Sequence, residues 1–397
     1  MENNKPKKPF ISSALFIVPA AIVATLLIII SGILVNMYSG IRASEKQQKE
    51  RMSVLREHYL SPDFRPVSEK DFCEFNLSEA LEKGVRYNEV QYIATHNSYK
   101  EDLTTFSRIA FNIIGPVGGM KERQFEYSMP TLTEQLNSGI RFFELDLSYM
   151  KRSGRWEIIC VHNPILDNKS NAIDIKLAFE EIKLWSENNP GHLPLTIFIE
   201  PKRDYLFLPT LKELGPSGIK EAEEIIKEVF GPKLITPSRM LGSYNNFREM
   251  TKAGDWPHLK DMLNSVLFVL FPNYSHEYFE RDPAMTENVF FISQWYHSFD
   301  EASENFNNNT LFIMTNEPDT LYNDDNAIEV FLAKNYFVRT RLDFFPVIDP
   351  ARKQLSFDSG AQLLTTDYPK GNTNAEDYYA AFEGGYMMRL SPREAMP

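Results

Sequence analysis

Three carboxylates and one amide stand where short apolar segments end, and their types suit a metal ion. Glu144 and Asp146 are one residue apart in the segment 140–148, so a strand would point both to the same face. The neighbouring residues are apolar on both faces, and two buried carboxylates repel each other unless a cation lies between them. Glu200 and Asn97 end two other segments. Four oxygen ligands with three negative charges predict a Ca²⁺ site, ahead of Mg²⁺ or a soft transition metal.

Histidines end two of the predicted strands. His96 follows the segment 90–95 and His162 closes the segment 156–162, whereas the other five of the seven histidines have no such placement. A single histidine at a strand end is more often structural than catalytic. Two that flank a shared metal site predict a pair that stabilises charge and moves protons.

Two basic residues stand at comparable positions. Lys202 follows Glu200 by two residues, and Arg341 shares one face of the segment 335–341 with Arg339 and, just beyond it, Asp343. An arginine fork suits phosphate oxygens. Lys202 and Arg341 are therefore candidates for substrate binding, with plain exposure to solvent as the alternative.

The elements that must position these side chains alternate between strand and helix. The pattern predicts helices at 171–188 and 217–230, and strands at 90–95, 140–148, 156–162, 194–200, 265–271, 310–315, 335–341 and 361–367. Eight such strands in an α/β chain predict a TIM-type (β/α)8 barrel with its site at the carboxyl ends of the strands. An open doubly wound sheet is the alternative. The polar segment 272–309, with a possible extra strand at 290–295, is predicted to be an excursion on the barrel rim.

The composition supports a large folded domain. Hydrophobic residues make up 43% and aromatic residues 13% of the 397 residues, which excludes global disorder. The net charge of −12 disfavours nucleic acid as a partner, because its phosphates require a basic surface. The only cysteines, Cys73 and Cys160, form neither a disulfide framework nor a cysteine-based zinc site.

The N-terminal region predicts a membrane anchor. Residues 10–35 carry no charge, and as a helix these 26 residues would be ~39 Å long, more than the ~30 Å of a hydrocarbon core. A cleavable signal peptide is the alternative, but no convincing cleavage site precedes Ser44. The predicted organisation is a cytoplasmic stub at 1–9, a transmembrane anchor at 10–36, a juxtamembrane stalk or linker at 37–74 and a catalytic barrel at 75–390. Residues 44–62 predict a helix within the stalk, and a disordered tether is the alternative.

The charges around the anchor set the expected orientation. Lys5, Lys7 and Lys8 precede it, but basic residues also follow it. Because long domains translocate largely regardless of charge, the basic N-terminal stub is the better guide. We expect a single-pass membrane protein with its large domain outside the cytoplasm.

Six segments resemble, in order, the calcium-dependent bacterial branch of the phosphatidylinositol-specific phospholipase C superfamily. They are THNSY (95–99), GIRFFELDLSY (139–149), IICVHNP (158–164), IFIEPK (197–202), FVRTRLD (337–343) and LLTTDYP (363–369). The resemblance implies that Asn97, Glu144, Asp146 and Glu200 bind Ca²⁺. It also implies that His96 stabilises the phosphoryl transition state and that His162 is the general acid. The implied substrate is a phosphoinositide-like lipid or a related phosphodiester, and the implied source of the protein is bacterial.

The implied reaction starts from the inositol 2-hydroxyl. Glu144 is expected to accept its proton and His162 to protonate the departing diacylglycerol, which leaves a cyclic inositol phosphate. One alternative is a glycerophosphodiester phosphodiesterase, which expects His-Arg-Gly where this chain has His96-Asn97-Ser98. The other is a barrel without catalysis that binds lipids or glycans, because a fold alone does not prove activity.

Overall fold

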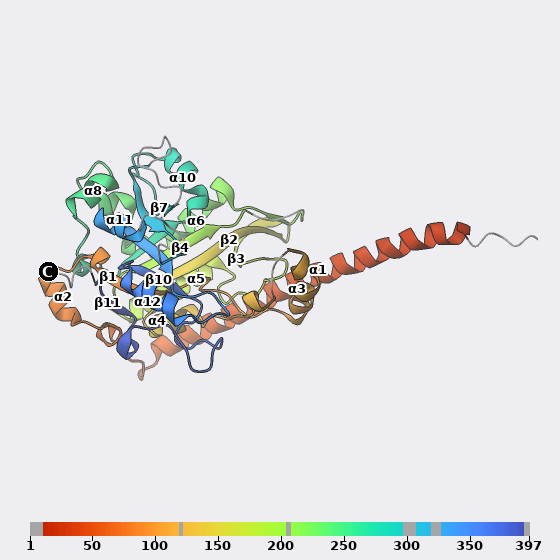
Figure 1. Cartoon of the computed structure of the whole chain (residues 1–397), viewed down its shortest axis with the longest axis horizontal. Helices are drawn as coiled ribbons and strands as arrows, with labels where there is room; N and C mark the ends of the chain where they lie inside the picture. Colours follow the sequence, from red (N-terminus) through yellow and green to blue (C-terminus); the bar gives the residue numbers. More distant parts are fainter. Residues whose placement is uncertain (1–10, 119–121, 204–207, 297–306, 319–326, 393–397) are drawn as a thin grey trace, which may run out of the picture.

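The chain folds into an α/β domain around one curled sheet of mixed direction, from which a single long helix projects (Figure 1). The computed structural model describes residues 11–118, 122–203, 208–296, 307–318 and 327–392. The predicted cytoplasmic stub, residues 1–9, lies outside the described residues.

Eight parallel strands follow one another across the described part of the sheet. In spatial order they are β2 (Phe142–Arg152), β4 (Leu195–Pro201), β6 (Val266–Leu270), β7 (Phe290–Trp295), β8 (Thr310–Met314), β9 (Phe337–Arg341), β10 (Leu363–Thr366) and β1 (Val90–Thr95). The two end strands of this series meet, because the Ser98 amide just beyond β1 donates to the Glu144 carbonyl of β2 at 3.0 Å. The sheet therefore curls round on itself, as the predicted barrel requires.

Three short strands run antiparallel at the ends of the series. They are β3 (Arg155–Cys160) and β5 (Leu211–Lys212), which pair with β2, and β11 (Met388–Leu390), which pairs with β1. The predicted barrel strand 156–162 is thus the second arm of a hairpin. Its turn is Ser153-Gly154, where both residues have positive φ, 49° and 84°, as the tight turns of β-hairpins require.

The segment 272–309 also differs from the expectation. Its described part includes β7, a full member of the parallel series, so the eighth strand comes from 290–295 and not from 156–162. Residues 297–306 of the predicted rim excursion lie outside the described residues. The β7 sequence FFISQW was predicted as a possible extra strand, but apolar periodicity alone does not show that such a strand joins the parallel series.

Helices cover the outside of the sheet. They are α2 (Leu77–Lys83), α3 (Thr105–Gly118), α4 (Leu132–Asn137), α5 (Ile175–Asn188), α6 (Gly215–Phe230), α7 (Pro237–Leu241), α8 (Phe247–Ala253), α9 (Leu259–Met262), α10 (Ser275–Arg281), α11 (Ala327–Ala333) and α12 (Pro350–Asp358). The predicted helices 171–188 and 217–230 correspond to α5 and α6. Asp174 caps α5 by accepting the Leu177 amide at 3.1 Å, which sets the start of that helix after the polar residues 171–174.

The core has an aromatic layer inside the curl of the sheet. Phe142, Phe198, Phe312 and Phe337 are buried, and their rings follow one another at centroid distances of 5.2–5.8 Å. Alternation along β2 and β4 places Phe142 and Phe198 on the same face as the carboxylates two residues further on. These rings therefore form an apolar floor beneath the predicted site.

The long helix α1 (Ile11–Leu60) joins the predicted anchor to the predicted stalk without a break. Among the described residues it is the one helix long and apolar enough to cross a membrane, and both an anchor and a signal sequence meet that test. Its second half is not a free stalk, because Met37, Ile41 and Met52 are buried against the domain. Figure 1 shows the first half leaving the body as a lone helix.

Candidate active site

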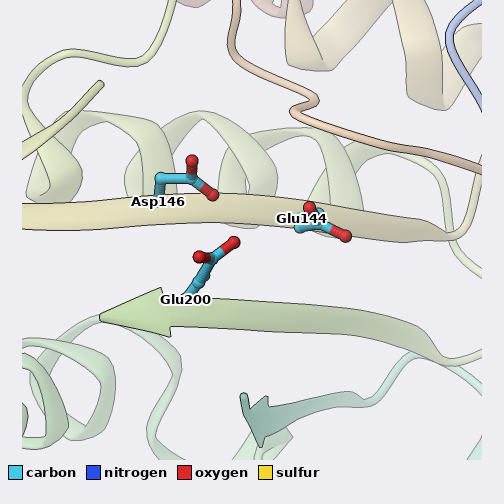
Figure 2. Close-up of side chains that lie close together, drawn as sticks. All are labelled: Glu144, Asp146 and Glu200. Atoms are coloured by element: carbon cyan, nitrogen blue, oxygen red, sulfur yellow. The ribbon is translucent and has the colours of Figure 1, made fainter. Parts of the chain in front are cut away.

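The three predicted carboxylates converge at the carboxyl ends of two neighbouring strands. Glu144 and Asp146 project from the inner face of β2, and Glu200 rises from β4 into the space beside them (Figure 2). Each offers an oxygen within 4.8 Å of the others. Glu144 and Asp146 are buried and Glu200 is partly exposed, so the cluster meets solvent at Glu200. The prediction that Glu144 and Asp146 share one face is correct.

Two basic side chains balance this charge. Arg339 on β9 places Nη2 2.8 Å from Glu144 Oε2. Lys202 places Nζ 2.7 Å from Asp146 Oδ2 and 2.8 Å from Glu200 Oε1. Burial alone would lower the pKa of Lys202, but Asp146 and Glu200 together hold that pKa above its usual range. Lys202 is therefore a charged ammonium that bridges two carboxylates of the cluster.

The cluster has the donor chemistry of a Ca²⁺ site. Burial first, and then the charge of the neighbouring Asp146, raise the pKa of Glu200. The charge of the buried Asp146 is balanced by Lys202, whose Nζ lies 2.7 Å from Asp146 Oδ2. Three carboxylates with free lone pairs fit a hard divalent cation.

Asn97, the predicted fourth ligand, lies at the turn after β1. Its φ is +47°, a left-handed conformation that asparagine tolerates better than most residues. Its side chain is buried, donates to Tyr127 Oη at 2.8 Å and accepts from Tyr99 Oη at 3.3 Å. Burial and then the Asp146 charge raise the pKa of Tyr99.

His96 is held by a carboxylate on one side and faces the cluster on the other. Its Nδ1 lies 2.8 Å from Asp367 Oδ1, and its Nε2 lies 3.5 Å from Glu144 Oε1. Arg341 Nη2 donates to the second Asp367 oxygen at 2.6 Å, and its Nη1 lies 3.4 Å from His96 Nε2. Burial alone would raise the pKa of Asp367, but Arg341 and His96 hold it below its usual range. Asp367 thereby orients His96 Nε2 and Arg341 Nη1 toward each other.

His162 has a matching partner. Its Nδ1 lies 2.8 Å from Asp167 Oδ2, in the loop that follows β3. The fully buried Lys100 places Nζ 3.1 Å from the other oxygen of Asp167. Burial alone would raise the pKa of Asp167, whereas Lys100 and His162 hold it below its usual range. This pairing leaves Nε2 of the partly exposed His162 available to the site.

Three functional side chains were not assigned from the sequence. Asp367 and Asp167 orient the two histidines, and Arg339 neutralises Glu144. Asp167 follows His162 by five residues in the irregular loop Asn163-Pro164-Ile165-Leu166, which gives no periodic signal. Alternation along β9 predicted that Arg339 shares a face with Arg341, but it could not predict that Arg339 pairs with Glu144 on β2.

Comparison with known proteins identifies the family. The family model described as "Phosphoinositide phospholipase C, Ca2+-dependent" matches residues 85–159 and 150–392, well over half of the chain. The region includes every site residue described above. A search of curated protein sequences gave no match.

Solved structures share the fold. One is the calcium-dependent phosphoinositol-specific phospholipase C from the Gram-negative bacterium Pseudomonas sp. with myo-inositol, at 18% identity and a TM-score of 0.54, covering 77% of this chain and 96% of that one. Another is the Ca²⁺-dependent phosphatidylinositol-specific phospholipase C from Streptomyces antibioticus, at 17% identity and a TM-score of 0.52, covering 71% and 94%. With the family match and the acidic cluster, these similarities lead to one conclusion: the chain belongs to the Ca²⁺-dependent phosphoinositide phospholipase C family of phosphodiesterases.

Proposed function

We propose that this protein is a membrane-anchored phospholipase C that cleaves a phosphoinositide-like lipid to diacylglycerol and an inositol phosphate, cyclic first. The observation that carries the proposal is a buried carboxylate cluster beside His96, with each of the two histidines, His96 and His162, held at Nδ1 by its own aspartate. A site that only bound a lipid would not need a proton donor fixed in one orientation.

The proposed architecture is a closed (β/α)8 barrel behind a single transmembrane helix. The contact between β1 and β2 supports closure. The proposed limits are the stub at 1–9, the anchor at 10–36, the linker at 37–74 and the catalytic barrel at 75–390. The location proposed for the barrel is the extracytoplasmic side of a bacterial membrane.

The reaction needs a base, an acid and a place for the phosphate charge. Glu144 accepts the proton of the inositol 2-hydroxyl as that oxygen forms its bond to phosphorus. The bond from phosphorus to the diacylglycerol oxygen breaks, and His162 Nε2 donates a proton to this leaving oxygen. Asp167 supports the imidazolium that makes this donation, through its bond to Nδ1.

Positive charge gathers where the phosphoryl group would sit. His96 Nε2 and Arg341 Nη1 lie 3.4 Å apart, which suits one phosphate oxygen. Ca²⁺ held by Glu144, Asp146, Glu200 and Asn97 would supply Lewis-acid activation of the 2-hydroxyl and the phosphate. Lys202, released from its carboxylates, is placed to contact the head group. The aromatic floor keeps water away from the inner side of the site.

An assay of the full-length protein tests this proposal. It compares phosphatidylinositol, phosphatidylcholine and glycerophosphoinositol in detergent micelles, each with Ca²⁺ or with chelator. The proposal expects Ca²⁺-dependent release of diacylglycerol from phosphatidylinositol, with a cyclic phosphate signal in the ³¹P spectrum of the early product. Preference for glycerophosphoinositol would contradict the lipid substrate and favour a glycerophosphodiesterase.

The proposed orientation has its own test. Protease added to intact spheroplasts should remove the barrel, since residues 63–397 lie outside the cytoplasm in this proposal. Full protection would contradict the orientation. Recovery of a mature form that starts near residue 40 would identify residues 10–35 as a signal peptide.

A further inference from the structure

The anchor and the catalytic domain form one rigid unit because α1 has no joint between them. Along α1 the side chains of Leu27 and Ile28 are 58% and 72% exposed, as expected of residues that meet lipid. Within about four turns Met37 and Ile41 are buried against Met150 of β2 and other residues of the domain. The helix is continuous through this change. A domain held in this way cannot swing on a tether.

Polar contacts fix the docked half of α1 to the loop that carries His162 and to the start of α5. Gln48 pairs with both backbone groups of Asp174, at 2.9 and 2.8 Å. The Ser170 amide donates to Ser44 Oγ at 3.1 Å, and Arg51 forms a 2.8 Å ion pair with the buried Glu181. These contacts set the direction of the helix as well as its position.

Helix α3 lies beside α1 at the point where α1 leaves the domain (Figure 1). Thr104 Oγ1 donates to Asn36 Oδ1 at 2.6 Å, and Asn36 Nδ2 donates to Ser107 Oγ at 3.2 Å. A Cβ atom on Gly32 would meet the Phe106 ring at 3.0 Å. Gly32 and Asn36 lie at the end of the mainly apolar run 10–35, which polar residues follow from Asn36 onward. Since ~20 helical residues span a hydrocarbon core, this end of the run reaches the head-group layer, and α3 lies at that level.

Over residues 105–113, where its side chains are described, α3 turns three large apolar side chains outward. Phe106, Ile109 and Ile113 are spaced as one helical face, and they are 36%, 56% and 70% exposed. The opposite face is buried through Ser107 and Phe111. A helix on the surface of a water-soluble domain has the reverse arrangement. An apolar face turned outward at the head-group level is what an interfacial helix presents to lipid.

This apolar face adjoins the active site. On the inner side of α3, Phe111 stacks on Phe125 at a centroid distance of 4.6 Å, and Phe125 lies 5.9 Å from the His162 ring. Helix α3 also lies between His96, after β1, and Glu144, on β2, in the chain. A bilayer in contact with α3 would therefore lie next to the mouth of the site.

We propose that α3 rests in the surface of the bilayer that α1 spans, so that the enzyme acts on lipids of its own membrane. The contacts of α3 with Gly32 and Asn36 of the anchor select this bilayer as the occupant of the apolar face, ahead of a second copy of the chain or another protein. The inference rests on the proposed anchoring and lipid substrate. Ile109 and Ile113 enter the interface, and the docked α1 fixes the site over one leaflet.

Fluorescence quenching tests the contact without any need for activity. The full-length Ile113→Cys protein, labelled with an environment-sensitive dye, is reconstituted into phosphatidylcholine vesicles that contain a lipid-borne quencher near the head group. Cys73 and Cys160 are buried and should stay unlabelled. The control is Val54→Cys, 64% exposed on α1 and ~28 Å beyond residue 35. We expect quenching and a blue shift at position 113 and neither at position 54. An unquenched label at 113 would overturn the proposal, and a blue shift without quenching would show a protein partner on this face.

A comparison of two vesicle mixtures tests action on the same membrane. Protein is placed either in vesicles that contain phosphatidylinositol or in phosphatidylcholine vesicles mixed with separate phosphatidylinositol vesicles. We expect hydrolysis at least ~10-fold faster in the first case, because anchoring raises the effective substrate concentration. Equal rates would overturn the proposal. Quenching at position 113 with no hydrolysis in either mixture would refute the proposed substrate and leave the membrane contact standing.

A double variant connects the two measurements. Ile109→Asn with Ile113→Asn should lower the rate in the first mixture ~10-fold, since the interfacial face loses its apolar area. Hydrolysis of a short-chain, monomeric phosphatidylinositol should stay unchanged, because neither residue belongs to the site. Val54→Asn is the matched control and should change neither rate. An equal loss on both substrates would contradict a membrane role for α3.

Discussion

Lys202 Nζ lies 2.7 Å from Asp146 Oδ2 and thereby provides the charge that balances the most buried carboxylate of the site. The same ammonium lies 2.8 Å from Glu200 Oε1. A cation is thus already present between the two carboxylates when no metal is bound. Binding of Ca²⁺ and retention of Lys202 on these carboxylates should therefore compete.

Lys202→Met tests this competition. The variant leaves two carboxylates without their partner, so the metal-free protein should lose about 3 kcal/mol of stability. Ca²⁺ should restore that charge balance, and the rise in melting temperature on adding Ca²⁺ should be larger than in the parent. Lys176→Met, which breaks an exposed 2.5 Å ion pair with Glu228, is the control and should leave the Ca²⁺ effect unchanged. An identical Ca²⁺ effect in Lys202→Met would show that Lys202 does not compete.

The two histidines should be separable by leaving group. His96→Ala and His162→Ala should each lower turnover of phosphatidylinositol by at least ~100-fold, the usual scale of acid–base contributions. His162→Ala should recover most of that loss on a substrate with a nitrophenyl leaving group, which departs without protonation, whereas His96→Ala should not. Steady-state rates on both substrates provide the measurement. Equal impairment of His162→Ala on both would rule out its role as general acid.

The docked half of α1 should support the fold and the position of His162. A side chain at Gly40 would overlap the Asn168 amide in the loop after His162. Gly40→Leu should therefore lower the free energy of unfolding by about 1–3 kcal/mol through overpacking. It should also lower turnover ~10-fold. Ala43→Leu places the same side chain on the exposed face of α1 and is the control. Thermal melts and rates in detergent should separate the two variants; if Gly40→Leu matches Ala43→Leu, α1 does not pack as described.

Stability should fall in acid through a residue far from the site. Burial lowers the pKa of His192 to about 4, and its Nδ1 lies 2.6 Å from the Leu193 carbonyl. Between pH 6.5 and 4 the unfolded chain therefore binds more protons than the folded chain. The neutral His192 contributes about 3 kcal/mol to the free energy of unfolding above pH 6.5, and this contribution is lost as the pH falls toward 4.

His192→Gln should remove that loss. Its melting temperature should drop less between pH 7 and pH 4.5 than that of the parent. His276→Gln, at a histidine whose side chain is 62% exposed, should follow the parent. Parallel curves for the parent and His192→Gln would show that His192 is not the group that titrates.

Side-chain alternation was a reliable guide to the site because it depends on backbone geometry alone. It placed Glu144 and Asp146 on one face of β2, and the ends of parallel strands brought Glu200 beside them. The partners of these groups could not be predicted in the same way. Asp367 meets His96 across 271 positions of sequence, and Arg339 meets Glu144 across 195. Such pairs are set by tertiary packing.

Strand direction was the weaker part of the fold prediction. Apolar periodicity predicts a strand at 156–162 equally well for a parallel barrel strand and for a hairpin arm. The Ser153-Gly154 turn makes this segment a hairpin arm, because its two residues with positive φ connect β2 directly to the antiparallel β3. The docking of residues 37–60 was also not predicted. Its buried residues mix Met and Ile with Gly, Ser and Gln, so the helix face that packs is not a plain apolar stripe.

The central claim is that Asp146 and its neighbours hold a Ca²⁺ ion required for cleavage of phosphatidylinositol. The most direct measurement is the rate of diacylglycerol release by the full-length protein as a function of free Ca²⁺, for the parent and for Asp146→Asn, which keeps the shape and removes one charge. We predict no activity in chelator, recovery with Ca²⁺ but poorly with Mg²⁺, and a higher Ca²⁺ requirement in the variant. Undiminished activity of the parent in chelator, or the same Ca²⁺ requirement in both proteins, would contradict the metal site.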